Sequence, residues 1–106
     1  SICKFQGISF KLADMAMEID VARSYLYQAA SMKDAGVPFT KEASIAKLYC
    51  TEVAGRVTDW AIQVHGGYGL MQEYDVERFW RDQRILHIGE GSSEVQRIII
   101  ARQLGC

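Results

Sequence analysis

Apolar residues in the first third of the chain recur at steps of three and four, the spacing that places side chains on one side of an α-helix. They are Ile8, Leu12, Met15, Ile19, Ala22, Leu26 and Ala29. Gly36 and Pro38 interrupt this pattern, and a second stripe comprises Ala46, Tyr49, Val53, Val57, Trp60 and Val64. The pattern predicts two long helices, the second with Thr40 as its N-cap, and the short turn between them requires an antiparallel pair.

Two shorter helices are predicted in the remaining residues. Val76, Phe79 and Trp80 give the first of them a short apolar face. Ser93 and Gln96 form a capping box for the last helix, which Gly105 ends. The apolar side of that last helix consists of Val95, Ile98, Ile99 and Leu104. The predicted fold is therefore all-α, an antiparallel up-and-down four-helix bundle in one domain spanning residues 1–106.

Composition narrows the classes of function. The 106 residues suffice for one hydrophobic core, and 12 Lys plus Arg nearly balance 13 Asp plus Glu, so the chain has no basic surface for nucleic acid. Three distant cysteines without a C-x-x-C spacing predict neither a disulfide framework nor a zinc site, and indicate a reducing compartment. His65 and His87 have no partner four residues away, so no metal site is expected. No apolar run is long enough for a membrane span.

Glu90 is the first candidate for chemistry, because it stands between Gly89 and Gly91 just before the predicted last helix. Unpaired backbone N–H groups at a helix start can bind a carbonyl oxygen or a phosphate. A substrate that excludes water raises the pKa of a neighbouring carboxyl group and makes it a competent base near neutral pH. The alternative, equally compatible with the pattern, is that the side chain only interacts with the positive end of the helix dipole.

Two further groups of residues have a functional and a structural interpretation. Gln63 with Gly66, Gly67 and Gly69 is compatible with a nucleotide cradle, but the pattern alone favours a glycine C-cap and a tight turn. A helix precedes these glycines, so they are not a Rossmann fingerprint. The charged residues of segment 81–84 could bind a phosphate. An ion-pair network that fixes the short helix to the bundle is favoured for Arg81, Asp82 and Arg84.

These motifs together resemble the C-terminal helical domain of the acyl-CoA dehydrogenases, flavin-dependent oxidoreductases that desaturate acyl-CoA thioesters between the α and β carbons. The resemblance covers essentially the whole chain. It includes the segments Ala43-Ser44-Ile45-Ala46-Lys47, Gln63-Val64-His65-Gly66-Gly67-Tyr68-Gly69, Arg81-Asp82 and Glu90-Gly91-Ser92-Ser93-Glu94. The combination of the glycine cluster and the Glu-Gly pair at the family's separation is highly specific.

The resemblance implies a role for each candidate residue. Glu90 would be the catalytic base that removes the α-proton while the β-hydrogen leaves as hydride to flavin N5, and its backbone N–H would help to polarise the thioester carbonyl. Gly91 would lie against the acyl-CoA. The FAD cofactor would be bordered by Ser92, Ser93 and Glu94, and the FAD of a neighbouring subunit would be reached by Gln6, Gln63, Val64, His65, Gly66 and Gly67.

The resemblance also implies partners and a larger protein. Family members form homodimers or homotetramers through this bundle and pass electrons to an electron-transfer flavoprotein, in the bacterial cytoplasm or the mitochondrial matrix. The family's N-terminal helical and middle β domains are not in this sequence, so the fragment alone is expected to be inactive. Gly89 stands where many members have an aromatic residue, which indicates a wider or differently closed acyl pocket. A related acyl-CoA oxidase and a non-catalytic oligomerisation module are the alternatives.

Overall fold

The computed structural model describes residues 1–106 and contains helices as its only regular elements. Four are α-helices: α1 (Gln6–Asp34), α2 (Thr40–His65), α3 (Asp75–Gln83) and α4 (Ser93–Gln103). Short 3-10 helices precede α1 and flank α3, at Ile2–Lys4, Gly66–Leu70 and Arg84–His87. The predicted all-α bundle with four helices is confirmed.

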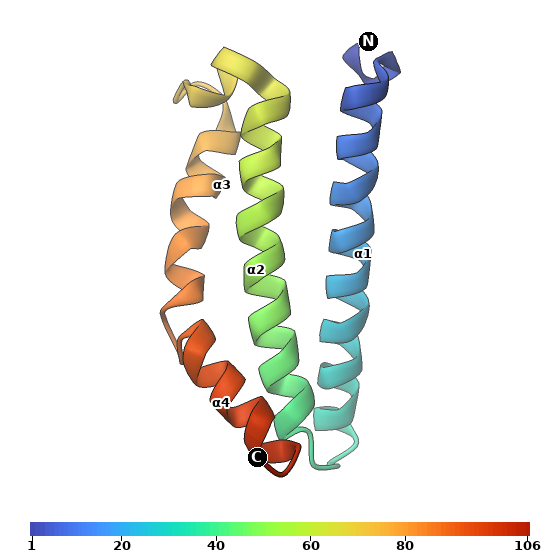
Figure 1. Ribbon diagram of the computed structural model, residues 1–106, viewed down its shortest axis with the longest axis vertical. Coiled ribbons are helices and arrows are strands. Elements are labelled where there is room, and N and C mark those ends of the chain that lie inside the picture. The colour runs from blue at the N-terminus through green and yellow to red at the C-terminus, as the bar shows by residue number, and fades with distance from the viewer.

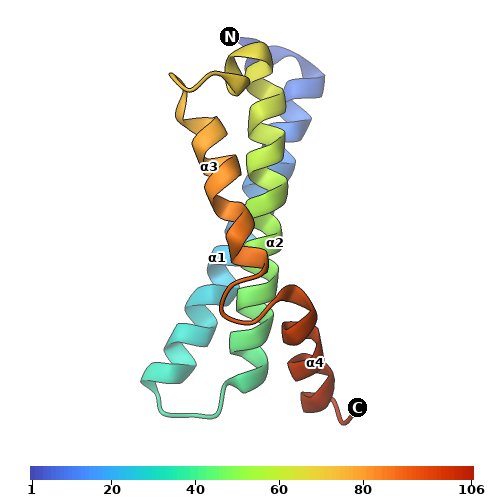
Figure 2. The same ribbon diagram turned by 90° about the vertical axis from the view of Figure 1, so that its left-hand side faces the viewer.

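Helix α2 lies at the centre of the arrangement. Helix α1 runs antiparallel to it on one side, while α3 and α4 follow one another along another side (Figure 1). Figure 2 shows the same arrangement edge-on, with α4 diverging from α1 at the lower end. The molecule is elongated, with extents of 47 × 26 × 25 Å. Helix α2 is therefore the common packing surface for the other three.

Small side chains allow α1 and α2 to approach closely. Ala22 and Ala29 on α1 and Ala46 and Val53 on α2 are all buried, in agreement with the two predicted stripes. An ion pair between Arg56 Nε and Glu18 Oε2, 2.9 Å apart, also joins the two helices. Both of its side chains keep contact with solvent, so small-residue packing contributes more than this pair does.

Most large apolar side chains remain accessible. Only 10 of the 106 residues are buried. Helix α4 buries Ser93 and Gln96, while three of the four residues of the predicted apolar side stay exposed, with Ile98 at 51% and Leu104 at 69%. Helix α1 likewise exposes Phe10. None of the helices has the length and apolar character required to cross a membrane.

The starts of two helices differ by one residue from the predictions. Phe39 is the N-cap of α2 and makes no side-chain capping bond, so Thr40 is the first helical residue and the predicted Thr40 cap is wrong. Ser92 caps α4 because its Oγ accepts a hydrogen bond from Val95 N at 3.3 Å. The hydroxyl of Ser93 is buried and donates to His87 O at 3.4 Å, so it is not available for the predicted capping box.

The position of Cys50 between α1 and α2 favours the protonated form of its thiol. Burial raises the pKa of the Cys50 thiol, and its Sγ donates to Ala22 O at 3.5 Å. Cys3 and Cys106 are exposed. At a pH of about 8, near the ordinary thiol pKa of about 8.5, we expect iodoacetamide to alkylate Cys50 more slowly than the other two. Peptide mass spectrometry over time measures this, and equal rates at all three sites would contradict it.

Candidate functional site

The Glu90 turn, residues 88–92, connects the 3-10 helix Arg84–His87 to α4. Glu90 is the only non-glycine residue of the chain with positive φ, at 58°, and Gly91 follows with φ 90°. Left-handed backbone is unfavourable for residues with a Cβ and costs about 1–3 kcal/mol at a single site. The surroundings of the turn must therefore hold Glu90 in this conformation.

Two side chains supply that restraint from outside the turn. Lys47 Nζ on α2 donates to Leu86 O at 2.8 Å and to Gly91 O at 2.6 Å. Gln96 Nε2 on α4 donates to Glu90 O at 3.4 Å and to Gly91 O at 3.3 Å. Hydrogen bonds from a charged donor contribute about 1.5–3 kcal/mol each, which is enough to offset the unfavourable backbone of Glu90.

Five consecutive backbone N–H groups, from Glu90 to Glu94, have no acceptor within the chain. The first N–H groups of α4 that find one are those of Val95 and Gln96, which both bond to Ser92. Free donors before a helix, together with the positive end of its dipole, favour a carbonyl oxygen or a phosphate as ligand. The turn thus offers a carboxylate and a row of unused donors side by side.

The carboxylate of Glu90 is exposed and takes part in no ion pair or side-chain hydrogen bond. It is neither turned into the bundle nor neutralised by a cation. The acidic residue in the first turn of α4, where the dipole interaction is strongest, is Glu94. The dipole alternative therefore describes Glu94 better than Glu90.

A second group of candidate residues lies at the other end of the molecule. Gln6 begins α1, and segment 63–67 spans the end of α2 and the start of the next 3-10 helix. The start of α1 and the end of α2 lie at the same end of the molecule, at the top of Figure 1. Gly66 is the C-cap of α2 with φ 65°, as the structural interpretation predicts, and a Cβ on Gly66 or Gly67 would meet nothing within 4 Å. Gly69 is different, because a Cβ there would lie 2.7 Å from Ile62 O. Gly66 and Gly67 thus expose bare backbone.

Within one chain, the two groups of candidate site residues lie far apart. Lys47, which contacts the Glu90 turn, precedes Gln63 by 16 residues on α2. At a rise of about 1.5 Å per residue, this corresponds to about 24 Å along the helix axis. Glu90, Gly91, Ser92, Ser93 and Glu94 therefore form one cluster, and the residues near the end of α2 form another.

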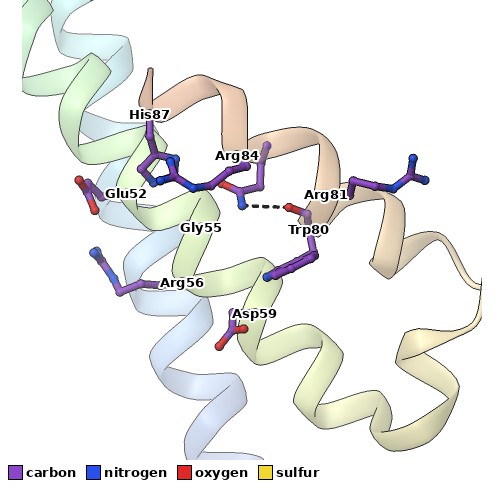
Figure 3. Close-up of a pocket in the computed structure, with 9 residues that line it drawn as sticks. Glu52, Gly55, Arg56, Asp59, Trp80, Arg81, Arg84 and His87 are labelled. Carbon is purple, nitrogen blue, oxygen red and sulfur yellow. Dashed lines mark hydrogen bonds between the residues drawn. The ribbon is translucent and has the colours of Figure 1, made fainter. Parts of the chain in front are cut away.

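The largest hollow of the chain is a third location, a groove of about 670 Å³ between α2 and α3 (Figure 3). It is lined by Glu52, Gly55, Arg56, Asp59, Trp80, Arg81, Gln83, Arg84 and His87. None of the predicted catalytic or cofactor residues is among them. Five of its nine lining residues are charged and the groove is open, although most of the surface they expose to it is apolar. The Glu90 turn remains the better candidate site, because it combines an unpaired carboxylate with free N–H donors.

The predicted ion-pair network of α3 is wrong. Arg81 pairs with Glu77 of its own helix at 3.3 Å and points away from α2 (Figure 3), and neither Asp82 nor Arg84 forms an ion pair. Helix α3 is held instead by buried Val76. The ring of His87, just after α3, covers Gly55, where a Cβ would be 3.0 Å from His87 Cε1.

Sequence reasoning missed Lys47 and Gln96 as the residues that hold the Glu90 turn. One signal for Lys47 was available: no acidic residue stands three or four positions away on α2, at 43, 44, 50 or 51. A lysine that is next to buried residues of its helix and has no acidic residue within reach on that helix is expected to bond to another element. For Gln96, the sequence pattern indicates only a role in capping α4.

Comparison with known proteins gives a consistent family. Residues 1–105 match the family model described as "Acyl-CoA dehydrogenase, C-terminal domain". The "Probable acyl-CoA dehydrogenase YngJ" of Bacillus subtilis is 59% identical over 103 residues, which cover 97% of this chain and 27% of that protein. The chain thus spans about a quarter of the length of such relatives.

Solved structures agree with this result. The butyryl-CoA dehydrogenase of Megasphaera elsdenii superposes with a TM-score of 0.97 at 50% identity, over 99% of this chain and 27% of that one. A chain in the structure described as "Electron transferring flavoprotein of Acidaminococcus fermentans: Towards a mechanism of flavin-based electron bifurcation" gives 0.96 at 43% identity, over 98% and 27%. These similarities extend over both candidate clusters.

Gly91 should be the least replaceable glycine of the turn. A Cβ at Gly91 would lie 2.6 Å from Gln96 Nε2 on backbone with φ 90°, whereas a Cβ at Gly89 would be 3.4 Å from its nearest neighbour. We expect Gly91→Ala to lower the free energy of unfolding by about 1–3 kcal/mol and Gly89→Ala by less than about 0.5 kcal/mol. Urea denaturation followed by circular dichroism measures both, and equal effects would contradict the account.

Proposed function

The chain belongs to the acyl-CoA dehydrogenase family, as its C-terminal domain, and on this premise we propose that it supplies the base that desaturates an acyl-CoA thioester. The observation that carries the proposal is the exposed, unpaired carboxylate of Glu90, held in left-handed backbone beside five free N–H donors. Strained backbone with free donors is typical of functional sites. A non-catalytic oligomerisation module would not require either feature.

In the proposed reaction, the Glu90 carboxylate takes the α-proton of the thioester and becomes a neutral carboxylic acid. The Glu90 N–H donates to the thioester carbonyl oxygen, which stabilises negative charge as the α-carbon loses its proton. The electron pair of the α-carbon–hydrogen bond forms the double bond to the β-carbon, which loses its hydrogen with both electrons. FAD, when bound, would supply the acceptor for that hydride at its N5. Gly91 lies against the acyl-CoA.

The residues of the chain fit FAD as two edges of a larger site. At the Glu90 turn, the Ser92 side chain and the free N–H groups of Ser93 and Glu94 can border the cofactor, although the Ser93 hydroxyl is already bonded to His87 O. The other edge consists of Gln6, Gln63, Val64, His65, Gly66 and Gly67. Their separation from the first edge supports the proposal that they contact the FAD of a neighbouring subunit.

The exposed apolar sides of the chain support the proposed assembly. Phe10 and Met17 on α1 and Ile98 on α4 each leave more than half of their surface accessible, at 61%, 59% and 51%. Apolar surface of this extent favours association, here into a homodimer or homotetramer. We assign the rest of the flavin and substrate sites to an N-terminal helical and a middle β domain, consistent with a chain that spans 27% of the relatives.

The electron acceptor in this proposal is an electron-transfer flavoprotein. The similarity to the Acidaminococcus fermentans structure, whose description names an electron transferring flavoprotein and flavin-based bifurcation, supports this choice. The reaction would take place in the cytoplasm of a bacterium or in the mitochondrial matrix.

Replacing the proposed base tests the function directly. In the full-length, flavin-loaded protein, Glu90→Gln keeps the size of the side chain but removes the proton acceptor, so we expect flavin reduction by acyl-CoA to slow by about 10²–10⁴-fold while flavin content is unchanged. Glu42→Gln, in the first turn of α2 and outside the site, is the matched control with normal rates. Near-normal reduction by Glu90→Gln, measured by stopped-flow absorbance, would refute the assignment.

A further inference from the structure

We propose that Lys47 is the positioning residue of the Glu90 turn, and that its ammonium group keeps the base and its backbone N–H in register with the rest of the site. The inference rests on the proposed function of Glu90. It concerns a side chain on α2 that is 43 residues away in sequence and touches the turn only through main-chain oxygens.

Lys47, on α2, bonds to the main chain on both sides of Glu90. Its Nζ lies 2.8 Å from Leu86 O, before the turn, and 2.6 Å from Gly91 O, directly after Glu90. Bonds this short from an ammonium group are charge-assisted and stronger than those between neutral groups. The same ammonium group therefore holds the main chain before Glu90 and directly after it.

The ammonium group has no carboxylate partner that would explain its position. None of the ion pairs of the chain includes Lys47, and both of its hydrogen bonds are to neutral carbonyls. No acidic residue of α2 stands three or four positions from Lys47, so its own helix offers the ammonium group no partner. The two hydrogen bonds of Lys47 show that it holds the main chain around Glu90.

Lys47 and Gln96 have different functions in this arrangement. Gln96 belongs to α4, which follows the turn directly, so its bonds to Glu90 O and Gly91 O fix the turn relative to its own helix. Lys47 belongs to α2, the helix on which all others pack, and its bonds fix the turn relative to the whole bundle. Without Lys47, the turn keeps its local shape but loses its fixed distance from α2.

Such a loss should affect the rate of chemistry more than binding. Proton abstraction depends steeply on the position of the base relative to the α-carbon, and a misplacement of about 1 Å can cost about 100-fold in rate. Both hydrogen bonds of the ammonium group are to main-chain carbonyls of this chain, so its loss removes no other side-chain contact at the turn. The expected signature is a lower kcat with little change in KM.

The test uses Lys47→Met in the full-length, flavin-loaded enzyme, because methionine keeps much of the length and removes the donors. Flavin reduction by saturating acyl-CoA is followed in a stopped-flow instrument. We expect the rate constant to fall by about 10–100-fold with an unchanged end-point amplitude per bound flavin. With α-deuterated substrate, the isotope effect on turnover should rise, because proton transfer becomes slower than the other steps.

Lys41→Met is the matched control, since Lys41 is on the same helix and makes no side-chain hydrogen bond or ion pair. A Lys47→Met rate constant within about twofold of the parent overturns the inference, as does a lower amplitude with an unchanged rate constant and isotope effect, which is the result of partial misfolding. If Lys47→Met does not retain flavin, Lys47→Gln is measured in the same way, and loss of flavin from both variants also overturns it.

The Glu90→Gln variant separates this inference from the function on which it rests. An inactive Glu90→Gln together with a normal Lys47→Met would leave Glu90 as the base and remove Lys47 from its role. An active Glu90→Gln variant would refute the proposed function itself, whatever the result for the lysine variants.

Discussion

Helix α2 is the one surface against which α1, α3 and α4 all pack, and every candidate site residue is placed relative to it. Three kinds of contact occupy different sides of this helix. Ala46 allows close approach of α1, Gly55 makes room for the ring of His87, and Lys47 bonds to the Glu90 turn. Because helices are stiff at this length, these contacts are fixed relative to one another. A change in α2 would therefore be felt at each end of the molecule.

The Glu90 turn has features that local folding preferences disfavour. A glutamate with φ 58° is unfavourable in an ordinary surface loop, and the five N–H groups from Glu90 to Glu94 have no acceptor within the chain. Under the proposed function, these features present the carboxylate to the α-proton and a backbone N–H to the carbonyl oxygen of the same thioester. The stabilisation comes from Lys47 and Gln96, which bond to the carbonyls and leave the N–H groups free. Acceptors in the turn are satisfied by the protein, and donors are left for a ligand.

The extent to which the sequence determined these features depends on the range of each interaction. Apolar spacing and the Gly36–Pro38 break predicted α1 and α2 correctly, because helix packing and chain breaks act over a few residues. The cap of α4 was wrong by one residue, since Ser92 and Ser93 are chemically equal and only burial separates them. The Arg81 network was wrong because Glu77, four residues away, competes as a local partner. The Lys47 bond to Gly91 spans 44 residues, and no pattern along the chain contains such a contact.

The proposed assembly and the proposed chemistry have a common structural basis. With 10 of 106 residues buried, the helices leave many of their large apolar side chains accessible. The two candidate clusters are about 24 Å apart along α2, a separation that side chains cannot close. Under the proposed function, α2 therefore acts as a spacer: it holds the base for one flavin through Lys47, in its N-terminal third, and presents bare backbone to another flavin at its C-terminal end. Association of subunits is then a requirement of the site, because neither cluster alone surrounds a cofactor.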